Sequence, residues 1–141
     1  MDTTETSRAL HLTVANEDYL ECMVRIERED GETEGVRSVD IAQRLNVSKA
    51  SVNKAVSTLK GQGLVDQSHY GKVMLTPEGR ELGEAVWYRH RLVRTFLMQE
   101  LGVPFERADA EACMMEHALS EDTMTKWLSY LEKQGITVVE D

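Results

Sequence analysis

Residues 38–63 read SVDIAQRLNVSKASVNKAVSTLKGQG, and this stretch decides the fold class. Its second half predicts a helix that begins after Ser48, a favourable N-cap residue, and stops at Gly61 or Gly63. The apolar residues of this helix recur at i, i+3, i+4 and i+7, so they share one face. They are Val52, Ala55, Val56 and Leu59. The other face is polar and cationic, which indicates a helix that packs on one side and contacts a partner on the other.

The first half of the stretch predicts a shorter helix, joined to the second by a turn of three or four residues. Ser38 is its expected N-cap. The residues that we expect to be buried are Val39, Ile41, Ala42 and Leu45. A short helix, a tight turn and a polar-faced helix form the helix-turn-helix pattern of DNA-binding proteins.

The flanking residues predict a third helix and a wing. A helix from Glu17, capped by Asn16, is expected to precede the motif and to end in the charged loop at 28–35. Its apolar positions are Leu20, Met23, Val24 and Ile26. After the motif, residues 64–76 (LVDQSHYGKVMLT) predict two short strands around a turn near Tyr70 and Gly71. The order of helices followed by a β-hairpin is that of a winged helix-turn-helix.

The C-terminal part is predicted to be entirely helical. Thr76 and Pro77 provide the N-cap and first position of a long helix that reaches Leu101, where Gly102 and Pro104 end it. Two further helices are expected at roughly 104–118 and 121–134. The predicted fold class is therefore mainly α, in three parts. These are a tail at 1–16, a winged helix-turn-helix DNA-binding domain at 17–75, and a linking helix with an all-helical dimerisation domain at 76–141.

The charge distribution favours double-stranded DNA as a partner. The chain carries a net charge of −9, but residues 37–80 contain seven basic and three acidic side chains, which gives +4 there and −13 elsewhere. A cationic segment of this kind can neutralise phosphates. The candidate DNA-binding residues lie before, on and after the polar-faced helix: Arg37, Ser48, Lys49, Ala50, Ser51, Asn53, Lys54, Tyr70 and Lys72.

Other sequence features place the protein in an ordinary cytoplasmic class. No run of residues approaches the roughly 18–20 apolar residues of a membrane span, and no basic segment precedes an apolar one as in a signal peptide. We expect no membrane partner. Two cysteines, Cys22 and Cys113, are too few for a disulfide framework, so both are expected to be reduced.

Residues 111–119, EACMMEHAL, raise the question of a metal site. If they are helical, Cys113, Glu116 and His117 present a sulfur, a carboxylate and an imidazole on one strip. Each could equally be explained alone, since cysteine is commonly a small buried apolar residue. Asp18 and Glu21 could likewise be solvated charges, and His90 a satisfied core histidine. Together these six residues, from three helices, are sufficient to bind one or two divalent ions.

The chain resembles the diphtheria-toxin-repressor family of metal-dependent transcriptional regulators over essentially residues 16–131. The motifs that carry the resemblance are EDYLE, DIAQRLNVSKASVNKAVSTLKGQGLV, LTPEG, RHRL and EACMMEHALS. The family implies a winged-helix domain and a helical dimerisation domain, with metal bound where they meet. Metal-loaded homodimers of the family bind palindromic operators and usually repress metal-uptake genes. The resemblance also implies that Ala50, Ser51 and Lys54 contact DNA bases, and that Lys49 and Asn53 lie nearer the phosphates of the DNA backbone.

The resemblance implies a hybrid set of metal ligands. Asp18, Glu21, His90, Glu116 and His117 fall where the manganese-responsive branch has its two-metal cluster. The resemblance implies a glutamate in the manganese-responsive branch at the position of Cys113, whereas the iron-responsive branch has the cysteine found here. The expected cofactor is Mn²⁺ or Fe²⁺, with Co²⁺ or Zn²⁺ able to bind in vitro because a thiolate favours softer ions.

Two further features of the family have no counterpart in this sequence. Arg94 stands where the ancillary site of the iron branch needs a carboxylate, so that site is not expected. The third, SH3-like domain of longer members is not expected either, since the sequence ends at Asp141.

Two other functions remain as alternatives. One is a winged-helix regulator that responds to an organic effector, for which the ligand-type residues would be coincidental. The other is a metallohydrolase, since carboxylate-rich sites can hold two catalytic metals. The sequence contains no HExxH motif, nucleophile elbow or glycine-rich phosphate loop, which argues against an enzyme and against an organic substrate.

Overall fold

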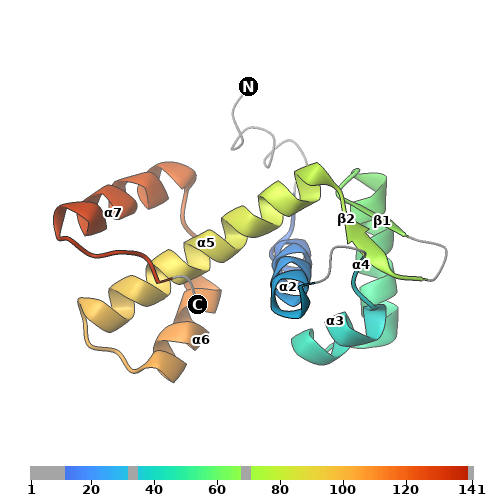
Figure 1. The fold of residues 1–141 in the computed structure, drawn as a ribbon, viewed down its shortest axis with the longest axis horizontal. Helices are drawn as coiled ribbons and strands as arrows, with labels where there is room; N and C mark the ends of the chain where they lie inside the picture. Colours follow the sequence, from blue (N-terminus) through green and yellow to red (C-terminus); the bar gives the residue numbers. More distant parts are fainter. Residues whose placement is uncertain (1–11, 32–34, 68–70, 140–141) are drawn as a thin grey trace. The chain divides into compact units, whose positions relative to one another are not determined.

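The computed structural model describes residues 12–31, 35–67 and 71–139 (Figure 1). The chain divides into two compact units, residues 1–85 and 86–141, and the division falls within helix α5 (Pro77–Gln99). None of the helices in the described ranges is long and apolar enough to span a bilayer. Each unit has its own hydrophobic core, so the two are treated in turn.

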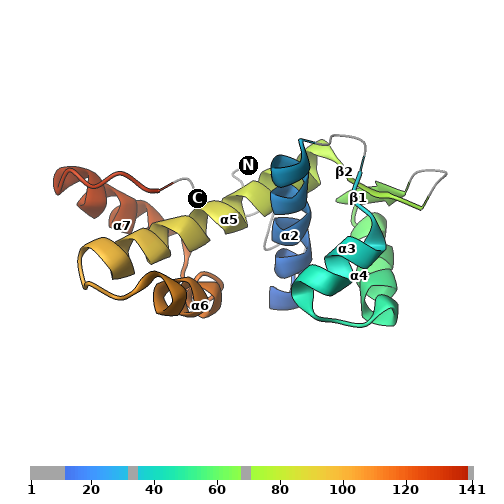
Figure 2. The same ribbon diagram turned by 60° about the horizontal axis from the view of Figure 1, so that its bottom comes forward.

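The first unit is a winged helix-turn-helix, which confirms the predicted fold class. Its elements before α5 are α2 (Val14–Asp30), α3 (Ser38–Leu45), α4 (Lys49–Gly61), β1 (Val65–Gln67) and β2 (Val73–Leu75). α2 contacts both α3 and α4, and α4 leads directly into the two-stranded sheet (Figures 1 and 2). The core between these elements is formed by apolar residues of all three helices and both strands.

α2 begins three residues earlier than the sequence predicted. Thr13, not Asn16, is the N-cap, and its side-chain oxygen accepts a hydrogen bond from the backbone N–H of Asn16 at 3.0 Å. Asn16 is therefore inside the first turn, and the prediction of its capping role was wrong. All four apolar residues expected to be buried on α2 are buried.

The helix-turn-helix itself forms as predicted, with corrections at α3. Arg37 is the N-cap residue of α3 and makes no side-chain capping hydrogen bond, whereas Ser38 is already helical. Val39 is 39% exposed rather than buried, because it lies on the side of this short helix away from the fully buried Ile41. Asn46 turns the chain in the left-handed conformation (φ 54°), and Ser48 caps α4 through the N–H of Ser51. The predicted apolar face of α4 is buried in full.

The wing is an antiparallel pair of strands with one additional bridge. β1 and β2 pair in the register Val65 with Leu75 and Gln67 with Val73. Val36, just before α3, also exchanges two backbone hydrogen bonds of 2.8 Å with Val73. Gly35 permits this approach, because its φ is +113° and an added Cβ would lie 3.0 Å from the Lys72 side chain. The sheet thus anchors the start of α3 as well as the hairpin.

The second unit is helical, as predicted. Its elements are the C-terminal part of α5, α6 (Phe105–Met115) and α7 (Glu121–Lys133). α6 and α7 flank the C-terminal part of α5 in both views (Figures 1 and 2). Their shared core contains Leu92 and Val93 of α5, Ala112 of α6 and Leu131 of α7, all fully buried. α6 and α7 are both shorter than predicted, and the end of α6 affects the metal ligands.

Candidate metal centre and nucleic-acid interface

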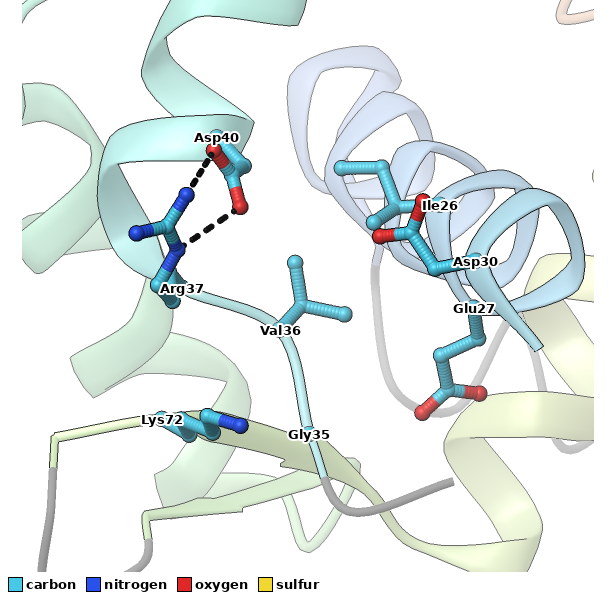
Figure 3. Close-up of a pocket in the computed structure, with 8 residues that line it drawn as sticks. All are labelled: Ile26, Glu27, Asp30, Gly35, Val36, Arg37, Asp40 and Lys72. Atoms are coloured by element: carbon cyan, nitrogen blue, oxygen red, sulfur yellow. Dashed lines mark hydrogen bonds and ion pairs between the residues drawn. The ribbon is translucent and has the colours of Figure 1, made fainter. Parts of the chain in front are cut away.

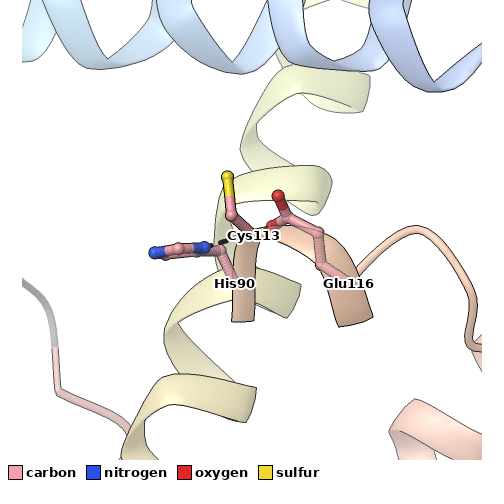
Figure 4. Close-up of side chains that lie close together, drawn as sticks. All are labelled: His90, Cys113 and Glu116. Atoms are coloured by element: carbon pink, nitrogen blue, oxygen red, sulfur yellow. Dashed lines mark ion pairs between the residues drawn. The ribbon is translucent and has the colours of Figure 1, made fainter. Parts of the chain in front are cut away.

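Three ligand-type side chains of the second unit converge. His90 is on α5, Cys113 is in the last turn of α6, and Glu116 directly follows α6 (Figure 4). One possible ligand atom from each, a ring nitrogen, a sulfur and a carboxylate oxygen, lie within 4.8 Å of one another. His90 comes from α5 and the other two from the end of α6, and both helices contribute to one core that includes the fully buried Ala108 and Ala112. This separation is short enough for one ion to contact all three.

Glu116 is the centre of this cluster. Its side chain is fully buried, and within the described ranges neither carboxylate oxygen has a hydrogen-bond partner. Its Oε2 lies 3.5 Å from His90 Nδ1, and its Oε1 lies 3.4 Å from His117 Nε2. A buried carboxylate that lacks hydrogen bonds is costly unless a cation or proton compensates it. Imidazole, thiolate and carboxylate groups are also a donor set for Mn²⁺, Fe²⁺, Co²⁺ or Zn²⁺, so these residues fit a divalent metal ion.

The predicted helical strip is interrupted at its end. α6 stops at Met115, and Glu116 is its C-cap residue, so His117 lies in the following turn and not on the helix. The expectation that Cys113, Glu116 and His117 share one helix was therefore wrong for His117. The turn nevertheless leaves the His117 imidazole beside the Glu116 carboxylate, because residues 116 and 117 are adjacent in the chain.

A carboxylate that was not predicted from the sequence lies on the other side of His90. Asp109 Oδ1 lies 2.7 Å from His90 Nε2 and accepts a hydrogen bond from Arg94 Nη1 at 2.9 Å. Partial burial raises the pKa of Asp109, but the hydrogen bonds from His90 and Arg94 lower it more, so the pKa lies below its usual value. Asp109 is four residues before Cys113, and Arg94 is four residues after His90. The i, i+4 spacing places Asp109 on the same face of α6 as Cys113, and Arg94 on the same face of α5 as His90, but it does not show that these two faces meet.

The remaining two predicted metal ligands are on α2 of the first unit. Asp18 is half-buried, and Glu21 is buried with its Oε2 3.6 Å from Arg25 Nη1. They are three residues apart, which places them on neighbouring positions of one helical face. Their part in metal binding remains a prediction.

The two cysteine thiols differ in accessibility, which gives a direct chemical test. Burial raises the pKa of Cys22 to about 12, whereas Cys113 is exposed. Because the thiolate is the reactive species, we predict that a thiol reagent modifies Cys113 quickly in the folded, metal-free protein and Cys22 only after unfolding. Mass spectrometry of the labelled peptides checks this. A Cys113→Ser variant should lose the fast reaction, and persistence of fast labelling would contradict the assignment.

The polar face of α4 is available to a partner. Val52, Ala55, Val56 and Leu59 face the core, and the predicted DNA-binding residues of this helix are all exposed: Ser48, Lys49, Ala50, Ser51, Asn53 and Lys54. Ser48 Oγ accepts from the Ser51 N–H at 3.0 Å and donates to Ser51 Oγ at 3.0 Å. The Ser51 hydroxyl is thereby oriented at the helix N-terminus, where backbone N–H groups also favour an anion.

The predicted DNA contacts outside α4 lie in different surroundings. Arg37 and Lys72 both line a small pocket of about 170 Å³ with the end of α2 (Figure 3). Arg37 donates two hydrogen bonds of 3.1 Å to Asp40, so part of its charge is already compensated (Figure 3). Lys72 is half-buried and directly precedes the second strand. The predicted contact at Tyr70 lies outside the described residues.

Comparison with known families accounts for both units. Residues 11–73 match the iron-dependent repressor N-terminal DNA-binding domain, and residues 76–134 match the iron-dependent repressor metal-binding and dimerisation domain. The chain belongs to the iron-dependent repressor family. This confirms the family resemblance in the sequence, since the motifs that carried it lie within these two matches, apart from Leu75 at the start of LTPEG.

Relatives in this family include a transcriptional regulator and an iron-dependent repressor. The transcriptional regulator MntR of Escherichia coli O6:H1 is 37% identical over 128 residues, which cover 91% of this chain and 80% of MntR. The iron-dependent repressor IdeR of Mycobacterium tuberculosis is 38% identical over 104 residues, 72% of this chain and 45% of IdeR.

A solved family structure has the same fold. A manganese-dependent transcriptional repressor in complex with manganese matches with a TM-score of 0.73 and 33% identity, over 83% of this chain and 52% of that one. The chain thus spans about half the length of this solved family member.

Proposed function

We propose that the protein is a metal-dependent transcriptional repressor that binds operator DNA as a homodimer when Mn²⁺ or Fe²⁺ occupies its ligand cluster. The observation that carries this proposal is the convergence of His90 and Cys113 on the buried carboxylate of Glu116 in the second unit. The exposed polar face of α4 in the first unit supplies the surface for DNA. Membership of a repressor family favours this role over that of an enzyme.

The proposed ligand set comprises Asp18, Glu21, His90, Cys113, Glu116 and His117. Carboxylates and imidazoles suit Mn²⁺ and Fe²⁺, and the single thiolate shifts the preference toward Fe²⁺, Co²⁺ or Zn²⁺. The ion would neutralise the buried charge of Glu116 and would be coordinated by side chains from several helices. His90 of α5 and Cys113 of α6 would coordinate the ion, and Asp18 and Glu21 would add ligands from α2.

Such an arrangement explains how metal could control DNA binding. Without an ion, carboxylates in one place repel one another, and the two units are expected to move more freely. Shared coordination would restrict that motion and hold the recognition helices of a dimer at the operator spacing. A coupling of about 1–3 kcal/mol is typical of such linkage.

A dimer is supported by apolar side chains on the surface of the second unit. Phe105 is 49% exposed, and Met114 is 70% exposed. Both are on α6, and exposed large apolar groups of this kind commonly mark an interface. A small winged helix reads one half-site, so a two-fold dimer would be needed for a palindromic operator. Sedimentation of a monomer at micromolar concentration, both with and without metal, would rule this part out.

The decisive experiment is an anaerobic titration of the cytoplasmic protein with Mn²⁺, Fe²⁺, Co²⁺ and Zn²⁺, with affinity for duplex DNA selected from a random library as the readout. We expect at least one of these ions to strengthen binding to the selected DNA. A matched Glu116→Ala, His117→Ala variant should lose the metal response and remain folded. Equal DNA affinity with and without every metal would instead favour a regulator with an organic effector.

Substitutions on α4 should separate charge from sequence recognition. Lys49→Ala is predicted to weaken selected and unrelated duplexes alike, and to reduce the slope of log K against log salt by about 0.9, because one phosphate contact is lost. Ser51→Ala is predicted to change the preferred sequence with little effect on the salt slope. Fluorescence anisotropy on both duplexes over a salt series measures both effects. The same loss on all duplexes for both variants would contradict the assignment.

A further inference from the structure

We propose that Asp109, held by Arg94, is a positioning residue that fixes which ring nitrogen of His90 faces the metal cluster. The inference extends the proposed metal-binding function, because it concerns how one proposed ligand is prepared for the ion. Asp109 and Arg94 both lie in the second unit, and neither is one of the proposed metal ligands.

A single carboxylate oxygen of Asp109 contacts both Arg94 and His90. Asp109 Oδ1 lies 2.9 Å from Arg94 Nη1 and 2.7 Å from His90 Nε2. A guanidinium can only donate hydrogen bonds, and an ionised carboxylate can only accept them. His90 Nε2 must then be the donor. In a neutral imidazole this leaves the lone pair on Nδ1.

The other edge of the ring faces the cluster. His90 Nδ1 lies 3.5 Å from Glu116 Oε2, and the histidine side chain is only 1% exposed. A buried ring has little room to reorient unless its neighbours move. The hydrogen bond to Asp109 therefore selects both the tautomer and the ring orientation that a metal ligand requires. Histidine ligands in metal sites usually donate their second N–H to a carboxylate or carbonyl in this way.

Arg94 is itself fixed on two sides, which makes the arrangement rigid. Its side chain is 4% exposed, and its guanidinium carbon lies 5.2 Å from the centre of the Phe105 ring. Phe105 is the first residue of α6, and Asp109 is one turn further along. Arg94 thus links α5 to the N-terminal half of α6, and Cys113 follows one turn after Asp109. Through these contacts the pair positions ligand atoms on both helices.

The first test uses the whole 141-residue chain without metal. In ¹⁵N NMR of histidine-labelled protein, we expect His90 to carry its proton on Nε2 and not on Nδ1, with the signal assigned by a His90→Gln variant. Asp109→Ala should remove the preference, whereas Asp109→Asn should keep it because the amide oxygen can still accept both hydrogen bonds. A wild-type His90 protonated on Nδ1 overturns the inference without any need for a variant to fold.

The second test measures Co²⁺ binding by optical titration, where a sulfur-to-cobalt band reports Cys113. Asp109→Ala is expected to weaken Co²⁺ binding about 10- to 100-fold, with Asp109→Asn between it and the wild type. Asp122→Ala, which removes an exposed carboxylate paired with Lys126 on α7, is the matched control and should bind like the wild type. Wild-type affinity and spectrum in Asp109→Ala would overturn the positioning role. Failure of the wild type to bind any metal would instead reject the proposed function, and the NMR result would still test the inference.

Discussion

Replacing Gly79 with alanine is expected to unfold the winged-helix unit or to destabilise it by about 3 kcal/mol or more. An added Cβ would lie 1.9 Å from the carbonyl oxygen of Leu64. That carbonyl cannot retreat freely, because it accepts a hydrogen bond from the N–H of Thr76 at 3.1 Å. Thr76 also caps α5 through the N–H of Gly79 and donates its hydroxyl to the Gly63 carbonyl at 2.7 Å. The clash therefore falls on backbone that three hydrogen bonds hold in place.

The matched control is Gly61→Ala, the same change at the last residue of α4. No atom lies within 4 Å of the position that its Cβ would take, and its φ is not in the left-handed range. Alanine there should leave stability unchanged or raise it by up to about 1 kcal/mol. Urea unfolding followed by far-UV circular dichroism measures both variants. Because Trp87 and Trp127 lie in the second unit, tryptophan fluorescence reports that unit separately. Equal midpoints for the two variants would refute the expectation.

The helix-turn-helix could be predicted because its apolar residues follow one face over two consecutive helices. On α4 the spacing of Val52, Ala55, Val56 and Leu59 leaves only one way to bury them, and the structure buries all four. Ser48 was also predicted correctly as the N-cap of α4, although Asn46, two residues earlier, is another favourable cap residue. These features depend on local periodicity and capping, which the sequence shows directly.

The errors arose where several residues could serve the same local role. Thr13 and Asn16 are both good cap residues, and the choice between them depends on how much of the chain before Glu17 can enter the helix. Val36 forms a single-residue bridge to Val73, and one residue has no alternation from which to predict a strand. Neither glycine nor proline marks the end of α6, so the turn that removes His117 from the helix could not be predicted.

The candidate site was only partly predictable for a different reason. Spacing along one helix predicts which side chains share a face, and it brought Cys113 and Glu116 together correctly. It does not specify which face of α5 meets that face of α6. The Asp109 interaction with His90 and Arg94 joins residues 15 to 19 positions apart on different helices, so it emerges only from packing.

Glu116→Gln is expected to stabilise the metal-free protein and to abolish the further stabilisation that metal gives the wild type. In the wild type without metal, the buried Glu116 carboxylate has no hydrogen bond within the described ranges, and the amide removes its charge at nearly equal volume. The variant should therefore gain about 1–3 kcal/mol when metal-free. With Mn²⁺ at 100 times its Kd, the wild type should gain about 2.7 kcal/mol, whereas the variant should gain almost nothing.

Thermal unfolding with and without Mn²⁺ checks both halves of this expectation, and the selected operator duplex checks its consequence for function. Glu111→Gln is the matched control, because it makes the same charge change on α6 at a half-buried position. It should shift stability by less than about 0.5 kcal/mol and keep the metal response. If Glu116→Gln were still stabilised by Mn²⁺ to the wild-type extent, Glu116 would not be a ligand. Its buried charge would then need compensation from another source. A metal-free variant that is more stable but cannot respond would indicate that this carboxylate serves metal binding and not folding, since the uncompensated buried charge is what the ion relieves.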